Sequence, residues 1–189
     1  MPDTLQNIAS EIVVCRLCKL SEGRKNAVPG EGDEHARLMI IGEAPGKYED
    51  LQGRPFVGMS GKFLNKCLET VGISRQDAFV TNAVKCRPPS NRKPLEQEIA
   101  ACRPYLISQV AAIKPKLLLA LGTSACNALG IKYTHLSDVR GKIIDMALGA
   151  TKVRCFVTFH PSFPMRFPSK REAFLKDLSN VKNLMTTLR

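Results

Sequence analysis

The sequence lacks any apolar run of about 18 residues, the length that a membrane-spanning helix needs. Its first residues, Met-Pro-Asp-Thr-Leu-Gln, show no basic segment followed by an apolar one, so no secretory signal peptide is expected. Internal repeats, low-complexity tracts and long linkers are also absent. We therefore expect one domain over residues 1–189, without a membrane partner, in the cytoplasm, where thiols stay reduced.

Acidic side chains are few. The chain has 17 Asp and Glu against 28 Lys and Arg, a formal net charge of +11. An excess of this sign favours a polyanionic partner, because binding releases the partner's counterions. A basic surface that only maintains solubility has the same composition, so charge alone leaves nucleic-acid binding open.

Seven cysteines in a chain with reduced thiols favour metal binding or core packing over disulfides. Cys15 and Cys18 form a Cys-x-x-Cys hook, and Cys86 and Cys102 lie in the sequences Lys-Cys-Arg-Pro and Ala-Cys-Arg-Pro. Four thiolates complete either a tetrahedral zinc site or the ligand set of an iron–sulfur cluster, and on general grounds this spacing indicates zinc first. The three other cysteines lie on apolar faces and are predicted to be core residues: Cys67, Cys126 and Cys155.

Basic residues follow the last three cysteines of this set closely. They are Lys19, Arg87 and Arg103. Cationic neighbours favour the thiolate form of cysteine, and we expect these three to offset part of the charge of the metal site.

Hydrophobic periodicity predicts strands that alternate with helices. The expected strands cover residues 37–42, 78–82, 116–122 and 153–159. The expected helices cover residues 3–14, 60–72, 94–113 and 170–188, with a short one that ends at residue 129. Most strands are continuous apolar runs, as in parallel sheets that are covered on both faces. Pro104 falls inside the third long helix and is expected to kink or break it.

Polar residues follow three of the predicted strands. Glu43 comes after the first strand, Asn82 ends the second and His160 comes after the fourth. Ligands of parallel sheets bind beyond the carboxyl ends of the strands, so these residues predict one active site. Each also has a structural alternative, since an asparagine at a strand end often satisfies a turn and a lone histidine is more often structural.

Four motifs occur in a fixed order and are interleaved with the cysteines. They are Gly42-Glu-Ala-Pro-Gly46, Gly53-Arg-Pro-Phe-Val-Gly58, Asn82-Ala-Val-Lys-Cys-Arg-Pro-Pro-Ser-Asn91 and His160-Pro-Ser162. With these motifs the chain resembles the family-4 uracil-DNA glycosylases, the iron–sulfur class of thermophilic bacteria and archaea, from Cys15 to the last helix. The resemblance implies a three-layer α/β/α sandwich with a central four-stranded parallel sheet. It also implies a [4Fe–4S] cluster, in place of zinc, on Cys15, Cys18, Cys86 and Cys102.

The activity that the resemblance implies is monofunctional base excision. Such an enzyme flips uracil out of DNA and hydrolyses its N-glycosidic bond, which leaves an abasic site. No lysine sits at a motif position suited to Schiff-base attack, so a lyase activity is not expected. Residues 89–94 contain no histidine, which argues against the class that binds uracil covalently through a histidine.

The resemblance makes Phe56 the platform on which uracil stacks, in a pocket that also contains Gly42 and Ala44. Asn82 carries both a donor and an acceptor, as the reading of one edge of uracil requires. His160 is implied to donate to uracil O2 while negative charge collects on the departing base. Without the family, Phe56 reads first as a core phenylalanine under a loop.

Two carboxylates are candidates for the remaining roles. Family-1 enzymes have an aspartate that positions the water where this chain has Ala44, and a tyrosine that excludes thymine where it has Gly46. Glu43 is our candidate for the first role and Glu49 for the second. Either is alternatively a surface acid.

The predicted partner is uracil-containing DNA, single- or double-stranded, bound by a monomer, with a sliding clamp as a candidate protein partner. The apolar segment after His160 matches the superfamily's intercalation loop, and Phe163 and Met165 are the candidate wedges that fill the gap left by the base. The alternative is that these side chains pack into the core. The remaining predicted DNA contacts are Lys85, Arg87, Asn91, Ser162 and Arg166.

Two rival functions remain. A non-enzymatic iron–sulfur or zinc module would use the same charge and cysteines, but it gives no reason for Asn82 and His160 to follow strands. A nucleotide-binding enzyme would use Gly42–Gly46 or Gly122-Thr-Ser124 as a phosphate loop, and neither segment has the full pattern of such a loop.

Overall fold

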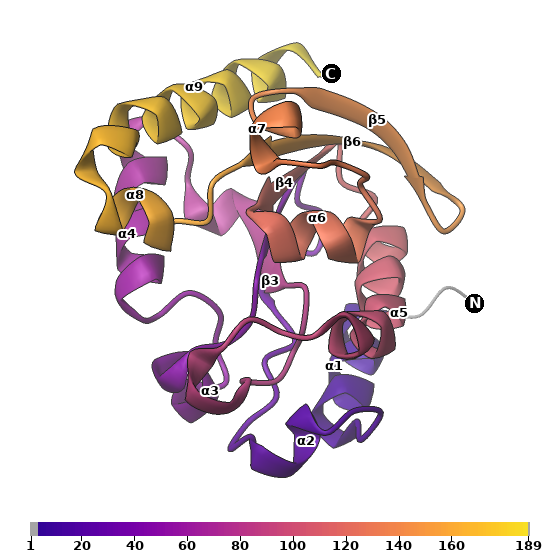
Figure 1. Ribbon diagram of the computed structural model, residues 1–189. Helices are drawn as coiled ribbons and strands as arrows, with labels where there is room; N and C mark the ends of the chain where they lie inside the picture. The colour runs from indigo at the N-terminus through magenta and orange to yellow at the C-terminus, as the bar shows by residue number, and fades with distance from the viewer. Residues whose placement is uncertain (1–3, 189) are drawn as a thin grey trace.

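The computed structural model describes residues 4–188 and consists of one mixed sheet with helices packed around it (Figure 1). The strand order is β1-β3-β2-β4-β6-β5. The strands are β1 (Glu31–Gly32), β2 (Leu38–Gly42), β3 (Ala78–Asn82), β4 (Leu117–Leu121), β5 (Ile143–Leu148) and β6 (Thr151–Thr158). The helices are α1 (Leu5–Val14), α2 (Leu20–Gly23), α3 (Lys47–Gln52), α4 (Met59–Thr70), α5 (Glu96–Ile113), α6 (Thr123–Leu129), α7 (Leu136–Val139), α8 (Ser162–Arg166) and α9 (Arg171–Thr187).

The four central strands, β3, β2, β4 and β6, are parallel, which confirms the predicted parallel core. Two antiparallel edge strands were not predicted: β1 pairs with β3, and β5 pairs with β6. β1 is only two residues long, and most of β5 is exposed or half-buried because it lies at the sheet edge. Edge strands of this kind leave little apolar pattern in the sequence.

The side chains of the central strands alternate between two apolar cores, one on each face of the sheet. Met39 and Ile41 of β2 join the core that also contains residues of α5 and α6. Leu38 and Ile40 join the core that contains residues of α4 and α9. The helices therefore form two outer layers (Figure 1), as the predicted three-layer sandwich requires.

Helix α5 runs unbroken past Pro104, so the predicted break is wrong. Proline removes one backbone hydrogen bond and leaves the carbonyl four residues earlier, that of Ala100, without its helical partner. Both residues are exposed, so water can satisfy that carbonyl, while Leu106 and Val110 on the opposite face stay buried. The predicted start of the first helix at residue 3 lies outside the described residues.

The carboxyl ends of the central strands lie at one edge of the sheet. Gly42 and Asn82, the last residues of β2 and β3, are directly paired, and the pairing continues where the Ala83 N–H donates to the Gly42 carbonyl at 2.9 Å. The chain moves from β2 outward to β3 on one side and to β4 on the other. Crevices of parallel sheets form at such a reversal of strand order.

Candidate active site

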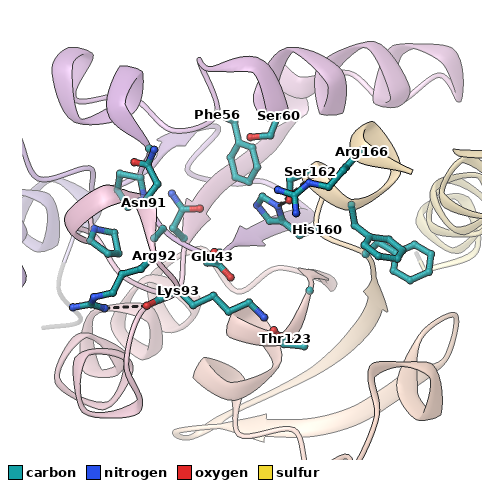
Figure 2. Close-up of a pocket in the computed structure, with 18 of the residues that line it drawn as sticks. Glu43, Phe56, Ser60, Asn91, Arg92, Lys93, Thr123, His160, Ser162 and Arg166 are labelled. Carbon is teal, nitrogen blue, oxygen red and sulfur yellow. Dashed lines mark hydrogen bonds between the residues drawn. The ribbon is translucent and has the colours of Figure 1, made fainter. Parts of the chain in front are cut away.

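A cavity of about 720 Å³ opens at the carboxyl ends of the central strands (Figure 2). Residues from distant parts of the chain line it, among them six of the predicted site residues: Glu43, Ala44, Glu49, Phe56, Asn82 and His160. Its size is in the usual range for small-molecule sites, roughly 300–1,000 Å³. The prediction that the motifs converge on one site is confirmed.

Phe56 lies against the backbone of Gly42, and only glycine fits there. A Cβ at position 42 would overlap both the Phe56 ring and Oδ1 of Asn82. On the far side, a Cβ at Gly61 would overlap the Phe56 backbone. Phe56 itself has a φ of 54°, the left-handed region that non-glycine residues rarely adopt. The ring is both a buried residue of the core and a wall of the cavity, so the interpretation as a core residue is confirmed, and the role as the platform for uracil stays a prediction.

The side-chain amide of Asn82 is held at the cavity wall without a protein partner. The residue is only 2% exposed, it lines the cavity, and its amide makes no side-chain hydrogen bond among residues 4–188. Every fully buried side-chain nitrogen and oxygen of the described residues has a partner, so the Asn82 amide atoms are open to the cavity. The donor and the acceptor of this amide are therefore available to a molecule in the cavity.

His160 is held in one tautomer by the turn that follows it. The backbone N–H of Ser162 donates to its Nδ1 at 3.3 Å, and the Ser162 hydroxyl is 2.8 Å from the same nitrogen. An Nδ1 that accepts a hydrogen bond leaves the ring proton on Nε2. Burial lowers the pKa of His160 below its usual 6.5, although Glu43 and Glu49 act in the opposite direction. His160 is thus a neutral imidazole with an Nε2–H donor.

Glu43 and Glu49 are both fixed by hydrogen bonds. The Ser124 hydroxyl at the start of α6 donates to Oε2 of Glu43 at 2.7 Å. Glu49 accepts the Gly46 N–H through one oxygen, at 3.1 Å, and the Gly58 N–H through the other, at 2.7 Å. Glu49 is buried, and it joins the loop after β2 to the loop that carries Phe56. Neither carboxylate is a free surface acid.

The four cysteines of the predicted metal site line a second, small cavity between α1, α5 and the segment after β3. Cys15 and Cys18 are half-buried, and Cys86 and Cys102 are buried. Within residues 4–188, no three Cys, His, Asp or Glu side chains form a group that would hold a single metal ion.

Two of the basic residues that were predicted to offset the charge of the metal site, Arg87 and Arg103, form hydrogen bonds elsewhere. Nε of Arg87 donates to Asn91 at 2.8 Å, and Nε of Arg103 donates to the Ala128 carbonyl at 2.9 Å. Arg24 instead donates from Nη1 to Sγ of Cys86 at 2.9 Å. Burial raises the pKa of the Cys86 thiol, and Arg24 opposes this. Burial likewise raises the pKa of Cys102 to about 11, and there the opposing cation is Lys85.

Comparisons with known proteins agree with this geometry. The uracil DNA glycosylase superfamily matches residues 29–181, which include the whole lining of the large cavity. The type-4 uracil-DNA glycosylase of Saccharolobus solfataricus is 43% identical over 190 residues, which cover 98% of this chain and 88% of the relative. That of Pyrobaculum aerophilum is 45% identical over 179 residues, or 93% of this chain and 91% of the relative. The type-5 enzyme of P. aerophilum is 33% identical over 152 residues, or 71% and 65%.

The chain belongs to the type-4 uracil-DNA glycosylases. The predicted family is confirmed, and with it the predicted class of enzyme, a hydrolase of base excision repair. The comparisons do not test the roles of individual residues, which therefore stay predictions.

In this type-4 glycosylase, the active-site cavity is also lined by residues that were not predicted for the uracil pocket. Figure 2 shows Ser60 beside Phe56, and Lys93 extended across the cavity toward Thr123. Thr123 begins α6 one residue after β4, so its position near the end of an apolar strand was a usable signal, but it was named above only within the alternative phosphate loop Gly122-Thr-Ser124. Ser60, in the first turn of α4, and Lys93 have no comparable signal, because only the fold brings them to the strand ends.

The predicted DNA contacts are divided by the structure. Asn91, Ser162, Phe163 and Arg166 line the cavity, and Arg87 contacts it only through its hydrogen bond to Asn91. Met165 is half-buried and is not among the lining residues. The predicted loop is partly the short helix α8, and Phe167 after it lines the cavity and is 47% exposed.

Lys85 was predicted to contact DNA, and the structure contradicts this. Its side chain is 1% exposed and points into the protein beneath β3. Its Nζ donates to the Thr81 hydroxyl at 2.5 Å, the Asn82 carbonyl at 2.9 Å and Oε1 of Gln109 at 2.8 Å. A lysine in a basic motif is usually solvated, so the motif does not indicate that Lys85 is buried.

Proposed function

We propose that the chain binds uracil-containing DNA, turns the uracil into the large cavity and hydrolyses its N-glycosidic bond. The observation that carries this proposal is the Asn82 amide, which makes no side-chain hydrogen bond among residues 4–188 and opens to the cavity beside the Phe56 ring. Uracil offers an acceptor at O4 and a donor at N3, which match the two halves of an asparagine amide. Cytosine offers the reverse pattern and would leave buried polar groups unpaired, so the same amide selects against it.

His160 stabilises the departing base in this mechanism. As the bond to the sugar breaks, negative charge collects on uracil, and an N–H donor at O2 gains strength with that charge. The neutral Nε2–H tautomer, fixed by Ser162, provides such a donor without any movement of the ring. Removal of one donor of this kind typically costs about a hundredfold or more in rate.

Glu43 is proposed to orient the attacking water and to stabilise the positive charge that forms on the sugar. The Ser124 hydroxyl occupies one lone pair of Oε2, so it fixes the direction of the carboxylate. Glu49 is proposed to exclude the methyl group of thymine. A Cβ at Gly46 would lie 2.9 Å from Oε2 of Glu49, so the glutamate occupies the space beside Gly46, where family-1 enzymes have the tyrosine.

Contacts with DNA are proposed for the rim of the cavity. Phe163 and Phe167 are exposed, and their rings pack against each other at an angle of 50°, with centroids 5.0 Å apart. We therefore assign the wedge to Phe163 and add Phe167, while Arg87, Asn91, Ser162 and Arg166 meet the sugar–phosphate backbone. Both single- and double-stranded DNA suit such a rim. A monomeric state, a sliding clamp as partner and a cytoplasmic location stay predictions.

We propose a [4Fe–4S] cluster on Cys15, Cys18, Cys86 and Cys102. The support is the set of four sulfurs around one cavity together with membership of the type-4 family. The cluster would join α1 to the segment after β3 and hold the basic loop beyond Cys86 in place. Zinc is the alternative. Iron and sulfide in protein purified without oxygen would support the cluster, and stoichiometric zinc would contradict it.

One assay tests the activity and the reading of the base. The wild type should release uracil from U:G, U:A and single-stranded oligonucleotides without an added cofactor, and alkali should then cleave the strand. Asn82→Asp should lose uracil excision by about 2 kcal/mol, or roughly thirtyfold, because a carboxylate cannot donate to O4. The matched control is Asn180→Asp, an exposed position of α9 outside the cavity lining. Intact wild-type substrate would contradict the function, and unchanged Asn82→Asp kinetics would remove Asn82 from the pocket.

A further inference from the structure

Lys85 is a buried cation that the catalytic mechanism does not use. All three of its ammonium hydrogens are engaged by neutral oxygens, those of Thr81, Asn82 and Gln109. No carboxylate pairs with it among residues 4–188, and it shares the lining of the small cavity with Cys86 and Cys102. A buried charge without an opposite charge is costly, so the fold retains this lysine against a substantial penalty.

Arg24 approaches the same place from the other side. Its guanidinium donates to Sγ of Cys86 at 2.9 Å, to the Cys15 carbonyl at 3.0 Å and to the Val13 carbonyl at 2.7 Å. One side chain thus contacts the cysteine hook and a cysteine of the middle of the chain. A guanidinium suits this role because it presents several donors in one rigid plane.

The cysteine cavity has a one-sided charge distribution. Arg24 and Lys85 are the cations among its described lining residues, and no aspartate or glutamate lines it. Four thiolates outweigh the positive charge of an iron–sulfur core, so a cluster with its ligands is anionic. The positive charges of Arg24 and Lys85 would therefore balance part of the negative charge of the cluster.

We propose that Lys85 and Arg24 are positioning residues that supply the fixed counter-charges of the cysteine-bound cluster, which rests on the cluster proposed above. Lys85 also holds the Asn82 carbonyl, so the same ammonium ties the cluster to the residue that reads uracil. Residues that hydrogen-bond to metal ligands commonly change metal affinity by about 10- to 100-fold when they are replaced.

The test uses cluster-loaded protein and measures the cluster itself. Lys85→Met removes the buried charge at similar length, and Arg24→Gln removes the other charge but keeps an N–H donor for Cys86. We expect each to lower the chelator concentration that removes half of the iron by about tenfold or more. Each should also shift the reduction potential of the cluster to more negative values, because a lost cation disfavours the added electron.

Two controls separate charge from structure. Arg103→Gln removes a cation that is next to Cys102 in sequence but bound to the Ala128 carbonyl, and it should change neither quantity. Thr81→Val removes one hydrogen bond of Lys85 and keeps the charge, so it should leave the potential in place. If Lys85→Met does not fold, Arg24→Gln alone decides, since that side chain is outside the buried network.

The outcomes distinguish the two proposals. A wild type that carries zinc and no iron overturns the cluster and this assignment together. A wild type that carries iron, with both charge variants equal to Arg103→Gln in chelator resistance and potential, overturns only the counter-charges. A Thr81→Val variant that matches Lys85→Met in potential would mean that Lys85 acts through its hydrogen bonds, which also overturns the assignment.

Discussion

At the scale of single residues, the site depends on groups whose chemical state is fixed by a neighbour. His160 is neutral because Ser162 occupies Nδ1 and because burial disfavours the charged ring. Glu43 has one direction because Ser124 holds it. The Asn82 amide makes no side-chain hydrogen bond in the described structure and lines the cavity. Two side chains are thus held by neighbours, and the third is available for the proposed contact with the base.

The lowered pKa of His160 predicts a pH dependence of stability. Its folded pKa lies below the ordinary value of 6.5, so the unfolded chain binds the proton more tightly. The free energy of unfolding should therefore decrease as the pH falls below about 6.5, and it should level off below the folded pKa. Denaturant unfolding of the wild type and of His160→Gln, from about pH 7.5 to 5, measures this.

Other groups titrate in the same range, so the difference between the two proteins is the informative quantity. The free energy of unfolding of the wild type minus that of His160→Gln should decrease as the pH falls. A difference that is independent of pH would mean that His160 titrates normally in the folded protein.

At the scale of elements, α8 places its aromatic residues at the rim of the cavity. Phe159, Phe163 and Phe167 form a continuous stack of tilted rings, with centroids 4.8 and 5.0 Å apart and interplanar angles of 39° and 50°. Arg140 lies 4.5 Å from the centroid of the Phe159 ring at the inner end. Only the outer rings are exposed, so this stack presents aromatic faces to a base that enters or borders the site.

The stack predicts which residue of α8 and its flank contributes most to DNA binding. Phe167→Ala should weaken binding of uracil-containing single strands by about 1 kcal/mol or more, because a base loses its stacking face. Met165→Ala, in the half-buried position of the same element, is the matched control and should have a smaller effect. Equal losses in a binding titration would show that the stack has no special role.

The elements also show how far the sequence predicts this fold. Continuous apolar runs predicted the four parallel strands, because such strands are buried on both faces. The short elements near the site were missed, since α3 depends on the Glu49 carboxylate that holds Gly46 and α8 on a turn at His160. Motif positions predicted most of the pocket wall. The contact of Arg24 with Cys86 was beyond prediction because the two residues are 62 positions apart in sequence.

At the scale of the whole molecule, the excess positive charge is divided between fixed and available groups. Five arginines form ion pairs with acidic side chains of the described residues, and these are Arg54, Arg75, Arg92, Arg140 and Arg154. Arg166 at the cavity rim makes no such pair among residues 4–188. In the described part of the chain, no helix is long and apolar enough to cross a membrane.

This division predicts a local origin for the salt dependence of DNA binding. Arg166→Gln should weaken binding and reduce the slope of log K against log salt by about one, the effect of one lost phosphate contact. Arg154→Gln removes one positive charge from β6, which contributes no residue to the cavity lining, and it should leave the slope nearly unchanged. If both variants change the slope alike, the overall charge, and not the rim, determines binding.

The backbone of Phe56 has one more consequence, for the evolution of the site. A non-glycine residue in the left-handed region is disfavoured by about 1–2 kcal/mol, and Gly42 and Gly61 are needed on both sides of it. Glycine at position 56 would remove this backbone penalty, but it would also remove a buried ring from the core and leave a cavity there. The same ring is the proposed platform for the base, so the stability of the fold and the shape of the pocket cannot be selected independently at this position.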